Sequence, residues 1–231
     1  MSDIATNWQI VSARLREAEI KYQRDPHSVT LVAVSKTHDI GAISAAIAAG
    51  QLVFAESYVQ EALPKIEALA RSYPSLEWHY IGRMQSSKSK YLARHFAWVQ
   101  SVTKKEHAEQ LNKYRAENLP PLNICLEVNL SAEDTKAALA LSDVLSLAQA
   151  VAALPRLHLR GLMAIPAPSS DFATQFATFR RLADMYYELQ NCGFAVDTLS
   201  IGMSDDYVAA IAAGSTMVRI GAAIFGARRV C

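Results

Sequence analysis

Residues 31–35 read Leu-Val-Ala-Val-Ser, a short and continuous apolar run that ends in a polar residue. A strand buried on both faces has such a run, because neither row of its alternating side chains meets water. The run therefore predicts a strand of a parallel sheet with both faces covered. It follows a helical pattern at 3–24, in which Ile4, Trp8 and Val11 recur at helix spacing.

Outward from that run, strand and helix patterns alternate along the chain. The predicted strands are 31–35, 52–55, 77–81, 96–102, 123–129, 158–165, 198–201 and 217–220. The predicted helices between them are 39–49, 58–72, 85–95, 104–116, 136–153, 171–190 and 205–213. Strict alternation favours parallel βαβ units, and eight of them close into an α/β fold of the (β/α)8 TIM barrel type. An open, doubly wound sheet is the second interpretation.

The two ends of the chain refine this expectation. After Ile220 only residues 221–231 remain, which is scarcely enough for an eighth outer helix. The extra N-terminal helix at 3–24 precedes the first strand, and we expect it to take that outer place. No linker, repeat or shift in composition divides the chain, so residues 1–231 are expected to form a single domain.

Composition excludes several classes of protein. The 231 residues are 51% hydrophobic and carry a formal net charge of +1, which argues against intrinsic disorder and against a dedicated nucleic-acid binder. No stretch predicts a membrane span, and the N-terminus shows no signal peptide. The three cysteines form no CxxC pair, which predicts neither a disulfide framework nor a metal site. We therefore expect a cytoplasmic protein without bound metal.

In a (β/α)8 barrel the site lies where the strands end. Lys36 follows the first strand with the side-chain parity of Val32 and Val34, so inward valines would place its amine at the barrel mouth. A lysine removed from water becomes a nucleophile that can form a Schiff base. A lysine that reaches out to water at a strand end is the ordinary alternative.

The last two strands end in further candidates. After Ser200 the chain reads Ile-Gly-Met-Ser-Asp-Asp, where Ser204 is expected to cap a helix whose first turn holds Asp205 and Asp206. Gly221 ends the eighth strand and would let backbone N–H groups approach an anion. Because barrels often bind phosphate after strands seven and eight, Ser204 and Gly221 predict a phosphate site.

Arg219 has the side-chain parity of Met217 in an apolar strand, so it is expected to be buried. A buried arginine needs a partner, and Glu56 or a ligand atom are the candidates. Lysine, phosphate site and buried arginine together indicate pyridoxal 5′-phosphate (PLP), whose enzymes place an Asp or Arg at the pyridine nitrogen. His79, judged alone, is more typical of a core side chain than of a catalyst.

Several long motifs then stand in order along the chain. They are LVAVSKT at 31–37, ESYVQE at 56–61, EWHYIGRMQ at 77–85, RGLMAIPAP at 160–168, LSIGMSDD at 199–206, and AAIAAGSTMVRIG at 209–221 with AIFGAR up to Arg228. Together they resemble the motifs of the pyridoxal phosphate homeostasis proteins, also called the proline synthetase co-transcribed family. Motifs this long are specific, unlike a lone glycine pattern.

The resemblance implies a barrel like the N-terminal domain of alanine racemase, with PLP on Lys36 as a Schiff base. It implies phosphate binding by Ser204 and by the backbone of Gly221 and Ala222, and it places Arg219 at the pyridine nitrogen. The predicted cofactor-binding residues are Lys36, Ser57, His79, Ser200, Met203, Ser204, Arg219, Gly221 and Ala222. No catalytic residue is assigned.

The implied function is to carry or buffer PLP and to regulate intracellular vitamin B6 and amino-acid balance, without established catalysis. PLP-dependent apo-enzymes are candidate partners. The alternative is a PLP-dependent enzyme resembling an amino-acid racemase, and a third reading is an interaction module without cofactor. The chain stops at Cys231, so we expect no C-terminal racemase domain with its second acid/base and dimer contacts. The expectation is a monomer with at most weak PLP-dependent proton exchange on amino acids.

Four positions depart from the family pattern. The family's Gly-Glu-Asn is replaced by Ala55-Glu56-Ser57, and its Asn before Lys88 is replaced by Ser87. Its Gly-Thr is replaced by Gly221-Ala222, and its Lys-x-Gly by Lys136-Ala137-Ala138. The alanine at 222 removes a hydroxyl group that can bond a phosphate, so we expect weaker PLP binding.

Overall fold

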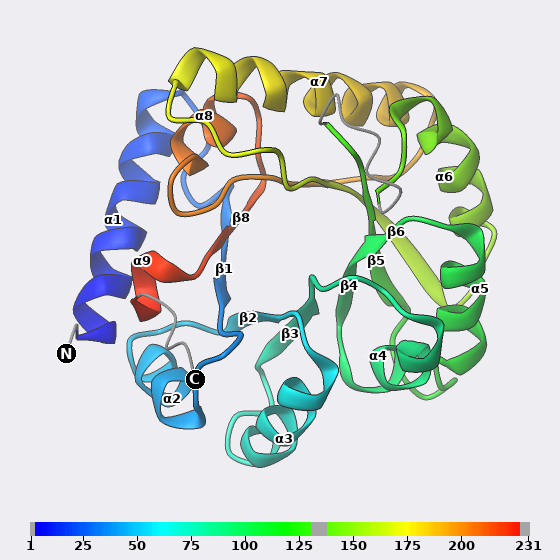
Figure 1. Cartoon of the computed structure of the whole chain (residues 1–231), viewed down its shortest axis with the longest axis horizontal. Helices are drawn as coiled ribbons and strands as arrows, with labels where there is room; N and C mark the ends of the chain where they lie inside the picture. The colour runs from blue at the N-terminus through cyan, green and yellow to red at the C-terminus, as the bar shows by residue number, and fades with distance from the viewer. Residues whose placement is uncertain (1–2, 131–137, 227–231) are drawn as a thin grey trace.

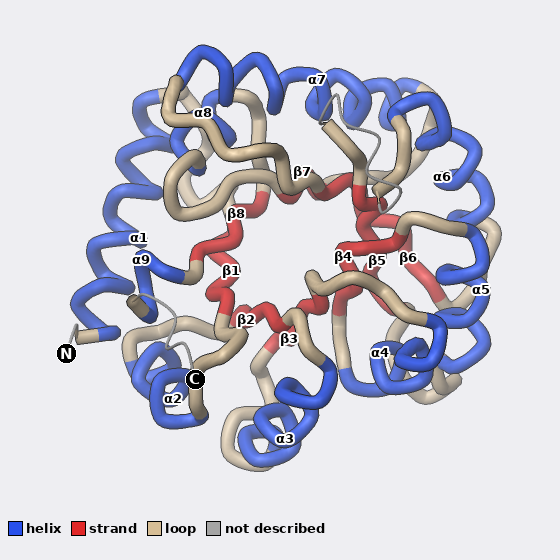
Figure 2. Tube along the Cα trace, viewed as in Figure 1, coloured by secondary structure: helices blue, strands red, loops and turns tan. Residues whose placement is uncertain are grey.

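The computed structural model describes residues 3–130 and 138–226, and its strands close into one parallel barrel. The strands are β1 (Thr30–Val34), β2 (Val53–Glu56), β3 (Glu77–Tyr80), β4 (Trp98–Val102), β5 (Leu122–Glu127), β6 (Leu157–Met163), β7 (Thr198–Ser200) and β8 (Met217–Ile220). Each strand pairs in parallel with the next, and β8 pairs with β1 (Figure 2). The predicted (β/α)8 barrel is confirmed, and the open-sheet alternative is wrong.

The helices form an outer ring around the strands (Figure 1). They are α1 (Ile4–Lys21), α2 (Ile40–Ala48), α3 (Val59–Ala70), α4 (Ser89–His95), α5 (Lys105–Tyr114), α6 (Val144–Ala152), α7 (Phe172–Asn191), α8 (Tyr207–Ala212) and α9 (Ala222–Phe225), with 3-10 turns η1 (Ser86–Lys88) and η2 (Leu141–Asp143). Within the described ranges, none of these helices is both long and apolar enough to cross a membrane.

Helix α1 fills the outer position that the short segment after β8 cannot fill. It packs against α2, α8 and α9, and Figure 1 shows it beside α8 and α9. The Asn7 side chain donates to the carbonyl of Ile224 at 3.0 Å, which ties α1 to α9. The apolar face of α1 buries Val11, Leu15 and Ala18. The predicted role of the N-terminal helix is therefore confirmed.

Apolar side chains fill two separate regions. The larger cluster lies between the barrel and its helices, where residues such as Phe54 and Trp78 point outward from their strands. A smaller cluster fills the barrel itself and includes Val32, Val34 and Met217. The inward direction of the two valines confirms the parity from which the position of the lysine after β1 was predicted.

Several predicted boundaries need correction, and the helix expected at 85–95 begins at Ser89 after the turn η1. The strand expected at 96–102 begins at Trp98, because Phe96 ends α4 and packs outward. The helix expected at 136–153 begins at Val144 after the turn η2, and residues 131–137 lie outside the described chain. The helix expected at 205–213 begins at Tyr207, for a reason that concerns the site.

Candidate functional site

A pocket of about 250 Å³ opens where the strands end, at the mouth of the barrel. It brings together seven of the nine predicted cofactor residues, from opposite ends of the sequence. They are Lys36, Ser57, Met203, Ser204, Arg219, Gly221 and Ala222. His79 and Ser200 do not line it, and they lie deeper in the barrel.

Lys36 lies two residues after the end of β1 and is half-buried in the pocket lining. The chain turns sharply after it, since Thr37 has a φ of +67°. The turn is held from outside by Glu61 on α3, whose carboxylate accepts the Thr37 N–H at 3.1 Å. The His38 N–H closes it by donating to the carbonyl of Ser35 at 3.1 Å.

A buried ion pair supports this turn from behind. Glu56 Oε1 accepts from Lys65 Nζ at 2.8 Å and from the Ser35 hydroxyl at 2.7 Å, and Lys65 also donates to the Ser35 carbonyl at 3.1 Å. Burial raises the pKa of the Glu56 carboxyl group, although the hydrogen bond from Lys65 opposes the shift. Glu56 thus faces α3, and its candidacy as the partner of Arg219 is wrong.

The turn after β7 forms another side of the pocket. Gly202 has a φ of +97°, and a Cβ there would lie 2.7 Å from the Cβ of Ala210, so the turn requires glycine. Asp206 closes the turn, because its Oδ1 accepts the Met203 N–H at 2.6 Å. Asp206 is therefore the residue before α8, and the expectation that Ser204 caps the helix is wrong. Ser204 instead lies in the turn and lines the pocket.

The segment after β8 completes that side. Gly221 precedes the four-residue helix α9, and its carbonyl accepts the N–H groups of Ile224 and Phe225 at 2.9 Å each. The first N–H groups of such a turn have no carbonyl within it to bond, so the N–H of Ala222, which lines the pocket, is available to another acceptor. The Ser204 hydroxyl and backbone N–H groups at one pocket are suited to an anion.

Arg219 is 2% exposed and reaches the pocket from inside the barrel. It donates to the Ser200 carbonyl at 2.6 Å, to the Ser200 hydroxyl at 2.7 Å and to the Ala164 carbonyl at 2.9 Å. Burial lowers the pKa of the guanidinium to about 10, so it stays protonated at neutral pH. These hydrogen-bond acceptors are uncharged, and the guanidinium is a cation beside the pocket.

His79 and Ser200 connect to the pocket through Arg219. Both side chains are fully buried, and both bond Gln100, which also lies inside the barrel. Gln100 was not predicted from the sequence as a residue near the site. It stands two residues after Trp98 in an apolar strand, so its side chain could have been predicted to be buried inside the barrel. His38 and Asp205 also line the pocket and were not predicted as site residues.

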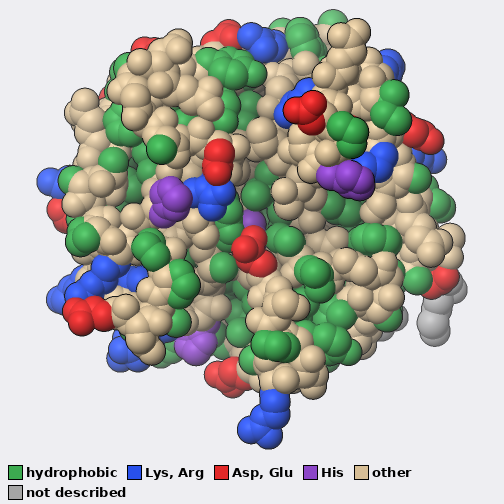
Figure 3. Space-filling model, turned by 180° about the vertical axis from the view of Figure 1, so that it is seen from behind, with side chains coloured by type: hydrophobic (Ala, Val, Ile, Leu, Met, Phe, Trp, Pro, Cys, Tyr) green, Lys and Arg blue, Asp and Glu red, His purple; other side chains and the backbone are tan. Residues whose placement is uncertain are grey.

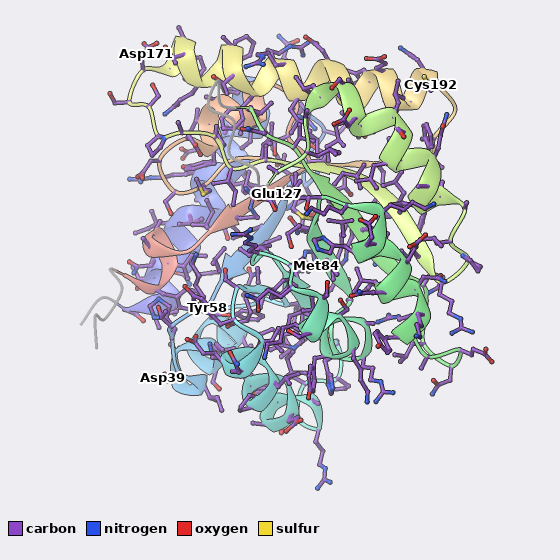
Figure 4. The ribbon with its side chains drawn as sticks, turned by 45° about the vertical axis from the view of Figure 1, so that its right-hand side comes forward. Asp39, Tyr58, Met84, Glu127, Asp171 and Cys192 are labelled. Atoms are coloured by element: carbon purple, nitrogen blue, oxygen red, sulfur yellow. The ribbon has the colours of Figure 1, made fainter. Side chains whose placement is uncertain are left out.

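Two tyrosines that flank the mouth do not enter this pocket. Tyr58 is 52% exposed and precedes α3, on the other side of the barrel from Glu127 at the end of β5 (Figure 4). The Tyr80 hydroxyl donates to the Arg83 carbonyl at 3.0 Å, and burial raises its pKa to about 12. Neither tyrosine is placed to exchange a proton in the pocket.

Comparison with known proteins gives one consistent result. The model of the alanine racemase N-terminal domain matches residues 3–229. The pyridoxal phosphate homeostasis protein of Pseudomonas aeruginosa is 51% identical over 228 residues, covering 99% of this chain and 97% of that protein. The protein of the same name from Escherichia coli K12 is 49% identical over 229 residues, covering 99% of this chain and 98% of that protein.

A solved structure also matches over nearly the full length. PipY of Synechococcus elongatus, with PLP bound, is 36% identical and superposes with a TM-score of 0.80, covering 91% of this chain and 98% of that chain. With fold, pocket and sequence in agreement, the chain belongs to the family of the pyridoxal phosphate homeostasis proteins, whose barrel is that of the alanine racemase N-terminal domain.

Proposed function

We propose that this protein binds PLP in the pocket at the barrel mouth and carries or buffers it, in the control of intracellular vitamin B6 and amino-acid balance. The observation that carries the proposal is the pocket lining, which combines Lys36, Ser204 and Arg219 with the backbone at Gly221 and Ala222. Relatives at about half identity bear the name of pyridoxal phosphate homeostasis proteins, and the related PipY has been solved with PLP bound.

The residues present fit the chemistry of PLP. That molecule carries an aldehyde, a phosphate and a pyridine nitrogen, and the pocket offers an amine, a set of anion donors and a buried guanidinium. The guanidinium is aligned by its bonds to Ser200 and Ala164, so it does not depend on a ligand for its place. When bound, PLP supplies an aldehyde that combines reversibly with amines.

Each lining residue then has a role. Lys36 would hold the aldehyde end, while Ser204 and the backbone of Gly221 and Ala222 would hold the phosphate. Arg219 would donate a hydrogen bond to the pyridine nitrogen and keep its own proton, because arginine is not deprotonated in proteins. Ser57 and Met203 line the same pocket and are proposed as further contacts.

Other parts of the proposal concern the protein as a whole. We propose that residues 1–231 act as one PLP-binding domain, as a monomer in the cytoplasm, and that PLP-dependent apo-enzymes receive the cofactor. Sedimentation or light scattering would measure the mass in solution. Transfer from the loaded protein to a PLP-free enzyme would be followed by the recovery of that enzyme's activity.

Attachment of PLP to Lys36 is the first prediction. Purified protein mixed with PLP should absorb visible light, and borohydride should reduce the linkage and leave a pyridoxyl group on the peptide that contains Lys36. Lys36→Ala should abolish this labelling, whereas Lys105→Ala, at an exposed lysine on α5, should not change it. The proposal fails if the Lys36→Ala protein is labelled to the same extent as the wild-type protein.

A further inference from the structure

A chain of hydrogen bonds runs through the inside of the barrel beneath the pocket. Arg219 Nη1 donates to Ser200 Oγ at 2.7 Å, and the Ser200 hydroxyl donates to Gln100 Oε1 at 2.7 Å. Gln100 Nε2 lies 2.7 Å from His79 Nδ1. His79 Nε2 in turn lies 2.8 Å from Glu77 Oε1. The chain thus links β8, β7, β4 and β3.

The chain joins the pocket to the opposite face of the barrel. His79, Gln100 and Ser200 are 0% exposed, whereas the Glu77 side chain is 42% exposed at the start of β3. Figure 3 shows that reverse face, where acidic, basic and histidine side chains gather around a central hollow. Trp98 stacks on the His79 ring at 4.9 Å and holds the imidazole in its plane.

The two ends of the chain determine the direction of every bond. A guanidinium only donates and an ionised carboxylate only accepts. Because Ser200 Oγ accepts from Arg219, its hydrogen is directed to the Gln100 carbonyl oxygen. The Gln100 amide N–H groups must then face His79 Nδ1, which accepts. The His79 proton is therefore on Nε2 and points at Glu77.

The reverse direction is inconsistent with both ends. If the Gln100 amide were turned over, Ser200 Oγ would face two donors and its own hydrogen would lose its acceptor. His79 would then donate from Nδ1, and its Nε2 would meet the Glu77 carboxylate without a proton unless the ring were doubly protonated. Burial lowers the pKa of His79 and so favours the neutral ring, although the Glu77 hydrogen bond opposes that shift.

We propose that Glu77 and Gln100 are positioning residues that act through Arg219. The run of donors begins at Arg219 and ends on Glu77, and its first acceptor, the Ser200 hydroxyl, holds one edge of the guanidinium so that the rest of the group faces the pocket. Bonds that donate in one direction polarise each other, so an acceptor oxygen at residue 77 keeps this direction and strengthens the acceptor at Ser200. The inference rests on the proposed function only in that Arg219 is the residue expected at the pyridine nitrogen.

The tautomer of His79 tests the chain without any cofactor. Nitrogen-15 NMR of the full-length protein, prepared free of PLP, should show a neutral His79 with its proton on Nε2. Glu77→Gln keeps an acceptor and should leave that state unchanged, whereas Glu77→Lys offers only donors and should displace the proton from Nε2. His158→Lys adds positive charge at an exposed site on β6 and should leave His79 unchanged.

Binding of PLP tests the consequence at the pocket. Gln100→Leu should weaken PLP binding about tenfold, because it removes the acceptor of the Ser200 hydrogen and frees that hydroxyl to turn. Glu77→Lys should weaken it severalfold and shift the visible absorption band, while Glu77→Gln should bind as the wild-type protein does. Because Glu77 is partly exposed, its variants test the idea even if Gln100→Leu does not fold.

The outcomes separate this inference from the proposed function. A wild-type protein with the His79 proton on Nδ1 would show that the inferred direction of the hydrogen bonds is wrong. Unchanged PLP affinity and an unchanged spectrum in both Glu77→Lys and folded Gln100→Leu would show that these residues do not position Arg219. A wild-type protein that binds no PLP would instead overturn the proposed function, while the NMR result would still decide whether the chain has the direction inferred.

Discussion

Ala222 is a single residue at which one missing hydroxyl group is expected to limit the affinity for PLP. It lines the pocket at the start of α9, at the position where the family pattern given by the resemblance has threonine. Ala222→Thr should tighten PLP binding about tenfold, because a hydrogen bond to a charged group contributes about 1.5–3 kcal/mol. Titration followed by the visible absorption of the bound cofactor measures the change.

Two comparisons make this prediction specific. Ala223→Thr places the same hydroxyl at the next, exposed position, which does not line the pocket, and should leave the affinity unchanged. Pyridoxal without its phosphate should bind weakly to the wild-type protein and to Ala222→Thr alike. Equal PLP affinity of Ala222→Thr and the wild-type protein would show that residue 222 does not face the phosphate.

At the scale of elements, the contact of β1 and β2 with α3 includes the buried Glu56–Lys65 ion pair. Glu56 Oε2 has no hydrogen-bond partner among the described residues. The hydrogen bonds of Lys65 and Ser35 to Oε1 therefore offset the cost of burying this carboxylate. Lys65→Met should lower the free energy of unfolding by about 3–5 kcal/mol at pH 8, because it leaves a buried charge without its counter-ion. The double variant with Glu56→Gln and Lys65→Met should show a smaller decrease in the free energy of unfolding, because no buried charge remains without a counter-ion.

The loss of stability caused by Lys65→Met should depend on pH in a definite direction. The pKa of Glu56 in the folded protein is already raised by burial, and without Lys65 the main opposing contribution is gone. A carboxyl group with a raised folded pKa contributes stability below its unfolded pKa of about 4.3 and loses it as the pH rises through the folded value. The loss caused by Lys65→Met should therefore be smaller at pH 5 than at pH 8 in urea unfolding. A larger loss at pH 5 would contradict the assignment.

At the scale of the whole molecule, we expect no racemisation of alanine. Besides Lys36 and Arg219, the titratable side chains that line the pocket within the described residues are His38 and Asp205. An arginine at the ring nitrogen leaves that nitrogen unprotonated, so the ring withdraws electrons weakly. Incubation of the PLP-loaded protein with each enantiomer in deuterated water should show no change of chirality, with at most slow exchange of the α-proton.

The control for this experiment is the Lys36→Ala protein under the same conditions. Racemisation that survives repurification and disappears in Lys36→Ala would make the protein an enzyme and overturn the carrier function. In that case His38→Phe would test whether His38, which stacks on Phe225 at 4.9 Å, serves as a second base. Tyr80 is excluded from that role because its hydroxyl is bonded to the Arg83 carbonyl.

Much of the fold was predictable because a parallel barrel depends on patterns that are local in sequence. Apolar runs bounded by turn residues marked all eight strands, and parity alone directed Val32 and Arg219 inward. The boundaries were less predictable, since they depend on caps. Asp206 rather than Ser204 precedes α8, and its carboxylate accepts the Met203 N–H in the folded turn.

The sequence by itself determined the barrel, the outer place of the N-terminal helix and most of the residues that meet at the mouth, because strand ends follow from the repeated strand and helix pattern. Only the tertiary structure decided which polar side chains form ion pairs and hydrogen bonds with each other. Glu56 pairs with Lys65 rather than Arg219, and Gln100 connects residues of β3 and β7 that no sequence spacing relates. Such contacts depend on the closure of the barrel, which brings distant strands within hydrogen-bond distance across its axis.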